Sequence, residues 1–133
     1  YTICNDVSER HFQVERKGQW MKGKCFESAG PLGPWLVTPD EIADVNNLRM
    51  WTKINGETRQ DGSTANMIFD CNKLLSYISQ FMVLEPGDVV TTGTPAGVAL
   101  GMKPPVWLKP GDEIEMGIDG LGVQRQKVIA FAG

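Results

Sequence analysis

The first quarter of the chain holds four side chains whose types and spacing suit a site for a metal ion and a small anion: Asp6, Arg10, Gln13 and Lys24. An aspartate supplies a hard oxygen ligand for Mg²⁺, Mn²⁺ or Ca²⁺. An arginine can hold a carboxylate through two parallel N–H bonds, and a lysine can stabilise an oxygen that becomes anionic during a reaction. One carboxylate holds a divalent ion poorly, so we expect only part of an enzyme site here.

Each of these residues also has an ordinary interpretation. Asp6 can cap the segment 8–12, Arg10 can form a surface ion pair, and Gln13 alone indicates nothing. Lys24 lies beside apolar residues, where a lysine that extends its amine to solvent is as common as a catalytic one. His11 is the only histidine, and on a helical segment it would point away from Asp6 and Arg10, which favours a surface role.

A second candidate segment is 91–97, which reads Thr-Thr-Gly-Thr-Pro-Ala-Gly. It directly follows a predicted strand, and such loops can present N–H and O–H donors to a carboxylate. Gly93 and Thr94 are therefore candidate substrate-binding residues. The segment lacks the Lys-Ser/Thr pair of a phosphate loop, so nucleotide binding is not indicated.

Composition indicates one ordinary globular domain covering residues 1–133, with 41% hydrophobic and 22% charged residues. The net charge of −3 argues against nucleic-acid binding, and no apolar run is long enough to cross a bilayer. The three cysteines have no metal-finger spacing and suit a reducing cytoplasm. Because the chain begins at Tyr1 within an apparent strand, we expect a domain that is incomplete at its N-terminus.

The pattern of elements predicts a β-rich α+β fold. Residues 1–5 should be a strand that delivers Asp6 to a sheet edge, and 7–34 a long structured loop. Asn55-Gly56 predicts a tight hairpin between two alternating strands. The expected strands are 35–38, 48–54, 57–60, 89–92, 113–118 and 123–131, with a helical turn at 39–41 and turns at 61–64 and 119–120.

One substantial helix is expected over about residues 70–82. Apolar side chains recur there at helical spacing, and Asp70 is a suitable N-terminal cap. We expect this helix to cover a sheet with its apolar face.

The whole chain resembles the C-terminal, catalytic part of the fumarylacetoacetate hydrolase family. The resemblance rests on several motifs in the right order, at residues 1–10, 23–26, 33–38, 55–61 and 92–98. The sequences of these motifs are most similar to those of a bacterial subgroup of diketo-sugar-acid hydrolases and hydroxyheptadienedioate isomerases.

The resemblance implies a mixed β-roll, usually in homodimers, with Mg²⁺, Mn²⁺ or Ca²⁺ held by three or four carboxylates. Asp6 matches one metal ligand, and Lys24 matches the catalytic lysine. Arg10 and Gln13 match residues near the substrate, and Thr94 matches the threonine that contacts its carboxylate. The implied reaction is hydrolysis of a C–C bond in a small 2,4-dioxo acid through a metal-bound enolate.

The family's Glu-x-Glu ligands and its water-activating histidine lie upstream of the residues matched here. The active form is therefore expected to need a complementary N-terminal segment. Two alternatives remain open: isomerase or decarboxylase chemistry on a related 2-oxo dioic acid, and a non-catalytic assembly module that lacks the full metal site.

Overall fold

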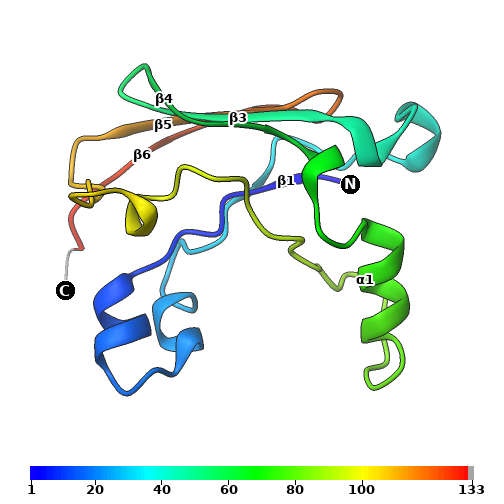
Figure 1. Cartoon of the computed structure of the whole chain (residues 1–133), viewed down its shortest axis with the longest axis horizontal. Coiled ribbons are helices and arrows are strands. Elements are labelled where there is room, and N and C mark those ends of the chain that lie inside the picture. The colour runs from blue at the N-terminus through cyan, green and yellow to red at the C-terminus, as the bar shows by residue number, and fades with distance from the viewer. Residues whose placement is uncertain (132–133) are drawn as a thin grey trace.

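The computed structural model describes residues 1–131, and its largest element is a four-stranded antiparallel sheet in the order β4-β3-β5-β6. Its strands are β3 (Arg49–Ile54), β4 (Glu57–Ser63), β5 (Glu113–Ile118) and β6 (Gly122–Lys127). Figure 1 shows this sheet along the top of the molecule, with the other segments beneath it. The predicted β-rich α+β class is confirmed.

The two faces of the sheet differ because side chains alternate along each strand. Thr52 of β3 is paired with Gln60 of β4 and with Met116 of β5, so these three side chains share one face. Met116 packs against the buried core, which identifies this face as the inner one. The outer face carries an ion pair between Arg49 and Asp61, with N–O distances of 2.9 Å.

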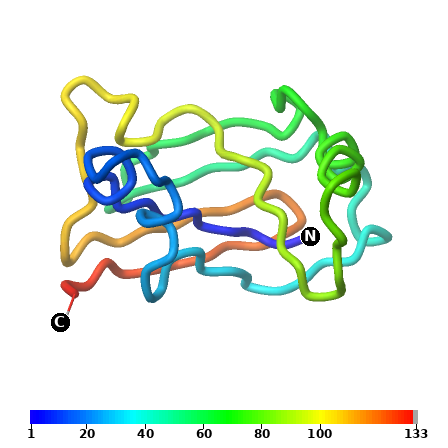
Figure 2. The backbone as a smooth tube through the Cα atoms, turned by 90° about the horizontal axis from the view of Figure 1, so that it is seen from below, coloured from blue at the N-terminus to red at the C-terminus, as the bar shows by residue number. Residues whose placement is uncertain are grey.

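A short two-stranded sheet of β1 (Ile3–Cys4) and β2 (Leu32–Gly33) lies under the inner face. Ile3 is almost completely buried, together with Val37 and Leu121. The Gln124 amide on β6 donates to the backbone carbonyls of Ile3 (3.0 Å) and Gly33 (2.6 Å). In Figure 2, seen from below, β1 lies in front of the large sheet and runs in nearly the same direction as its strands. These contacts fix the direction in which the chain leaves β1 towards Asp6.

The helix α1 (Cys71–Ile78) begins as predicted, because the Asp70 carboxylate accepts a hydrogen bond of 2.7 Å from the Lys73 N–H. It ends before residue 82, since the Gln80 and Phe81 N–H groups bond three residues back and tighten the last turn.

The prediction that this helix covers the sheet is wrong. Figure 1 shows α1 at one end of the molecule, away from the sheet. Much of its apolar surface is open: Tyr77 is 61% exposed, and Phe81, just beyond the end of the helix, is 65% exposed. Helical periodicity identified an apolar face but not what that face contacts.

Some predicted strands also differ. Residues 35–38 are not a strand; the pairing with β1 lies instead at β2, where Pro34 lacks an N–H to continue the ladder. Residues 89–92 form an extended segment with no ladder partner among residues 1–131. Strand β4 continues through the predicted turn at 61–64 as far as Ser63, because its pairing with β3 continues to Arg49. Strand β6 ends at Lys127, well before residue 131.

Short helical turns connect these elements. The predicted turn at 39–41 is confirmed, and the loop 7–34 contains two such turns. The short helical turns of residues 1–131 are the π-helical turn η1 (His11–Glu15) and the 3-10 helices η2 (Trp20–Gly23), η3 (Pro39–Glu41), η4 (Val45–Asn47), η5 (Thr64–Asn66) and η6 (Ala99–Gly101). In the part of the chain that is described, no helix has the length and apolar character needed to cross a bilayer.

Candidate active site

Two helical turns place Gln13 and Lys24 next to one another. The Glu9 N–H donates to the Gly23 carbonyl at 2.9 Å, which joins η1 to η2. A Cβ atom on Gly23 would lie 2.4 Å from the Glu9 oxygen and 2.6 Å from the Gln13 Cβ. Only glycine therefore allows this close approach, and Lys24 follows it directly.

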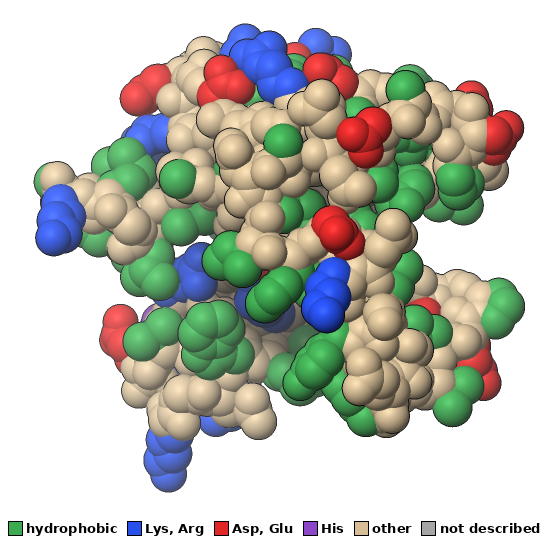
Figure 3. Space-filling view, turned by 45° about the vertical axis from the view of Figure 1, so that its right-hand side comes forward, with side chains coloured by type: hydrophobic (Ala, Val, Ile, Leu, Met, Phe, Trp, Pro, Cys, Tyr) green, Lys and Arg blue, Asp and Glu red, His purple; other side chains and the backbone are tan. Residues whose placement is uncertain are grey.

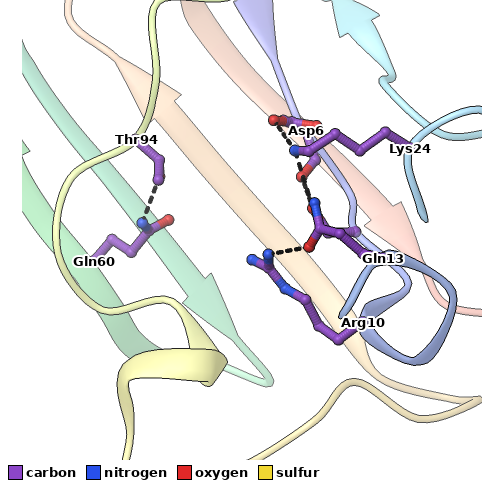
Figure 4. A network of polar contacts seen from close by, with 7 residues as sticks. Asp6, Arg10, Gln13, Lys24, Gln60 and Thr94 are labelled. Carbon is purple, nitrogen blue, oxygen red and sulfur yellow. Dashed lines mark hydrogen bonds and ion pairs between the residues drawn. The ribbon is translucent and has the colours of Figure 1, made fainter. Parts of the chain in front are cut away.

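Lys24 and Asp6 form an ion pair in this structure (Figure 4). The Lys24 amine also donates to the Ser8 hydroxyl at 3.2 Å. The two partners are half-open, with 29% of the lysine side chain and 48% of the aspartate side chain exposed. The lysine is thus held against a carboxylate and does not simply extend into solvent.

Gln13 is completely buried, which is unusual for a glutamine. Its carbonyl oxygen accepts a hydrogen bond from the Arg10 guanidinium, and this contact orients the arginine. Its amide nitrogen has no hydrogen-bond partner among the described residues. A buried donor without a partner is costly, and such groups mark sites where a ligand or water completes the bonding.

The loop 91–97 lies on the other side of the site. Figure 4 shows Thr94 and Gln60 facing the group formed by Asp6, Lys24 and Arg10. The Gln60 amide nitrogen donates to the Thr94 hydroxyl at 2.8 Å.

Both groups border one cavity of about 340 Å³, a size suited to a small organic ligand. Its polar lining includes five of the predicted site residues: Asp6, Arg10, Lys24, Gly93 and Thr94. Gln13 stands behind Arg10, which it contacts. The apolar part of the wall comes from the inner face of the sheet and from η2, including Met50, Met116, Ile118 and Trp20.

Sequence reasoning missed Ser8 and Gln60. The alternation of β4 could have placed Gln60 on the inner face, because hairpin pairing sets it opposite Thr52. No pattern in the sequence indicated that the loop at Thr94 would reach it.

The remaining candidates lie outside this chemistry. His11 is on the surface, where its Nδ1 atom lies 2.9 Å from a Glu15 carboxylate oxygen. Cys4 borders the cavity, but burial and the nearby Asp6 carboxylate raise the pKa of its thiol, which keeps it protonated and a poor nucleophile.

The described residues do not provide a complete site for a divalent cation. Asp6 is the only carboxylate among the residues that border the cavity. Residues 1–131 contain no cluster of three or more His, Cys, Asp or Glu side chains that could hold an ion. A hard cation needs more oxygen ligands than Asp6 offers.

The chain is thus an α+β domain whose sheet covers a small cavity bordered by a lysine, an arginine and a threonine. Residues 1–129 match the family described as fumarylacetoacetate (FAA) hydrolase C-terminal. The chain therefore belongs to the fumarylacetoacetate hydrolase family.

Individual relatives agree with this assignment. The chain is 54% identical over 127 residues to a protein of Burkholderia cenocepacia named "Putative hydrolase", covering 95% of this chain and 45% of the relative. The structure is similar to a fumarylacetoacetate hydrolase of Exiguobacterium antarcticum, with a TM-score of 0.94 and 45% identity over 98% of this chain and 47% of that one. It is also similar to a 2-hydroxyhepta-2,4-diene-1,7-dioate isomerase of Mycobacterium marinum, with a TM-score of 0.86 and 36% identity over 100% of this chain and 48% of that one. The chain thus spans about half the length of these relatives.

Proposed function

We propose that this chain is the catalytic part of a metal-dependent hydrolase that cleaves a C–C bond in a 2,4-dioxo acid. The observation that carries the proposal is that Arg10 and Lys24, from the first quarter of the chain, and Thr94, from the distant loop 91–97, border one cavity. Membership of the family and the similarity to a fumarylacetoacetate hydrolase support it.

Substrate binding follows from the donors around the cavity. The Arg10 guanidinium and the Thr94 hydroxyl are suited to a carboxylate, and Gly93 allows the backbone to approach it closely. Gln13 stands behind Arg10 and holds it in place, so we assign it an indirect part in substrate binding. The apolar wall accommodates the carbon chain of the substrate.

Hydrolysis of a 2,4-dioxo acid adds water to the C4 carbonyl and breaks the C3–C4 bond. The electron pair of that bond moves into an enolate whose negative charge lies on the C2 oxygen, and a proton then returns to C3. The products are a carboxylic acid and a 2-oxo acid. The role we assign to the Lys24 ammonium is to stabilise the enolate oxygen, a charge that develops only as the bond breaks.

Asp6 is the residue of this chain that we propose as a ligand for Mg²⁺, or for Mn²⁺ or Ca²⁺. Any further carboxylate ligand would have to come from outside residues 1–131, because the cavity holds no second carboxylate from the described residues.

Metal binding can be tested by calorimetric titration with Mg²⁺ and Mn²⁺, with and without oxalate as an enolate mimic. We expect oxalate to strengthen binding in the protein expressed from its complete gene, and Asp6→Ala to abolish it. Glu15→Ala is a matched control, because that carboxylate pairs with His11 on the surface. Equal binding by Asp6→Ala would remove Asp6 from the metal site.

Isomerase chemistry on a 2-oxo dioic acid is the second candidate, favoured by the solved structures that carry isomerase names. Decarboxylation is related to it, since each reaction can proceed through an enolate. Product analysis separates the three: hydrolysis yields two fragments, isomerisation yields none, and decarboxylation releases CO₂. A folded protein without any of these activities would instead indicate an assembly module.

A further inference from the structure

We propose that Gln60 is a positioning residue whose amide orients the Thr94 hydroxyl, so that the hydroxyl proton is directed at the carboxylate of the bound substrate. This inference rests on the proposed function, which places a substrate carboxylate at Thr94. It adds a residue of strand β4 to the site, on the side of the cavity opposite Lys24 (Figure 4).

The orientation of the Gln60 amide follows from its two partners. Its nitrogen lies 2.8 Å from the Thr94 hydroxyl oxygen and 2.8 Å from the Pro95 carbonyl oxygen. A backbone carbonyl can only accept a hydrogen bond, so the group that faces Pro95 must be the NH₂ and not the amide oxygen. Both hydrogens of the amide are therefore used, one on each partner.

The contact with Gln60 determines which hydrogen bonds the Thr94 hydroxyl can still form. A threonine hydroxyl has one hydrogen to donate and two lone pairs that accept. Because Gln60 occupies a lone pair, the single hydrogen of Thr94 remains available to another acceptor. An anionic carboxylate oxygen in the cavity is the acceptor that gains most from it, since hydrogen bonds to charged groups are the stronger ones.

The loop is held against β4 on both sides of this contact. Gly97 has a φ of +112°, and a Cβ there would lie 1.9 Å from the Arg59 carbonyl oxygen. A Cβ on Gly62 would lie 2.8 Å from the Pro95 Cβ. Glycine at 62 and 97 thus lets the loop approach the strand closely enough for Gln60 to reach Thr94.

The neutral charge of Gln60 also matters. A carboxylate in its place would accept the Thr94 proton and turn it away from the substrate. It would also face the Pro95 carbonyl without a donor and repel an anionic ligand. Gln60→Glu therefore keeps the shape of the side chain but reverses its hydrogen-bonding and electrostatic effect.

The experiment compares Gln60→Glu, Gln60→Met and Thr94→Val in the protein expressed from its complete gene, with 2,4-dioxopentanoate as substrate. We expect Gln60→Glu to raise KM at least tenfold at neutral pH with a much smaller change in kcat. As the pH falls and the introduced carboxyl group takes up a proton, KM should return towards the wild-type value. Gln60→Met should raise KM several-fold without this pH dependence. Thermal unfolding of each variant shows whether the fold is retained.

A double-mutant cycle separates positioning from a structural role. In the Thr94→Val background, Gln60→Met should raise KM no further, because the hydroxyl that it orients is gone. Equal effects of Gln60→Met in both backgrounds, or a KM for Gln60→Glu that does not depend on pH, would overturn the inference.

The carboxylate site at Thr94 and the positioning role of Gln60 can be rejected separately. If Thr94→Val leaves KM unchanged, the proposed carboxylate site at Thr94 is wrong, and the role of Gln60 is wrong with it. If Thr94→Val raises KM while both Gln60 variants behave as wild type, the proposed function stands and only the positioning role is rejected. Should 2,4-dioxopentanoate not be turned over, the dissociation constant of oxalate in the presence of Mn²⁺ replaces KM, with the same expected pattern.

Discussion

The Lys24 amine lies between the Asp6 carboxylate and the Ser8 hydroxyl, so its position depends on residues that precede it by more than a dozen places. Lys24→Ala should lower turnover by about 10²–10³-fold, the range observed when one donor to a developing anion is removed. The unfolding temperature should change little, because the side chain is partly exposed. Steady-state kinetics measures the turnover, and circular dichroism during heating measures the unfolding temperature.

Lys22→Ala is the matched control, because that neighbouring lysine reaches only the Arg16 carbonyl oxygen, at 3.3 Å. Full activity of Lys22→Ala with loss of activity in Lys24→Ala is the expected result. Unchanged turnover in Lys24→Ala would remove the lysine from the mechanism.

The side chains predicted from their types and spacing were largely those that meet at the cavity. Asp6, Arg10 and Lys24 belong to one contiguous segment, so their proximity was readable from the chain itself. The place of Gln60 in the site could not be read from the sequence, because it depends on a contact with Thr94, which lies 34 residues further along the chain. Their individual roles in binding and catalysis stay predictions.

Among the elements, the turn between β3 and β4 is tied to the start of β5 by the side chain of Asn55, which adds to the ladder between β3 and β5. The Asn55 amide donates to the Asp112 carboxylate at 2.9 Å and accepts from the Glu113 N–H at 2.9 Å. The Asp112 carboxylate also accepts from the Lys109 N–H. The hydrogen bond from Asn55, followed by that from Lys109, holds the pKa of Asp112 below its ordinary value of 3.8.

This contact predicts a pH dependence of stability. Because the pKa of Asp112 is lower in the folded state than in the unfolded state, its contribution is complete above about pH 4 and is lost as the pH falls through the folded-state value. Urea unfolding between pH 7 and pH 3 should show Asp112→Asn less stable than wild type at pH 7, with the difference shrinking in acid. A difference that stays constant across this range would contradict the assignment.

Local signals explain why both hairpins were predicted and α1 was misplaced. Asn55-Gly56 specifies a tight turn between adjacent strands, and its two strands need only each other. The apolar periodicity of α1 identifies its apolar face but carries no information about what that face contacts. The extended segment 89–92 was taken for a strand because alternation cannot tell whether a pairing partner exists.

At the scale of the whole molecule, large apolar side chains remain exposed on the described surface. Figure 3 shows them on both sides of a central hollow. Ile68 is 91% exposed, Val83 84% and Leu36 78%. Exposed apolar side chains that gather on one surface often mark a contact with another protein, so we expect some of these to be covered in the functional assembly.

We predict that the assembly is a homodimer in which the Ile68 and Val83 side chains are covered. The paired change Ile68→Ser and Val83→Ser should weaken self-association at least tenfold and leave the unfolding temperature nearly unchanged, since both side chains make few contacts within the chain. Sedimentation velocity over a concentration series measures the association. Leu36→Ser is a control for exposed apolar character outside the segment that contains α1. A monomeric wild-type protein would contradict the prediction.

The amide contacts that join β1 to β6 have a consequence for how the site is made during synthesis. Asn5 bonds to Gln126 at 2.6 Å across 121 residues, and Gln124 bonds to Ile3 across the same separation. Asp6, which follows Asn5, therefore reaches its final position only after the strand that holds Gln124 and Gln126 has been synthesised, more than a hundred residues later in the chain. Folding that depends on such distant contacts is slow, and the site stays unfinished until the hairpin of β5 and β6 has emerged from the ribosome.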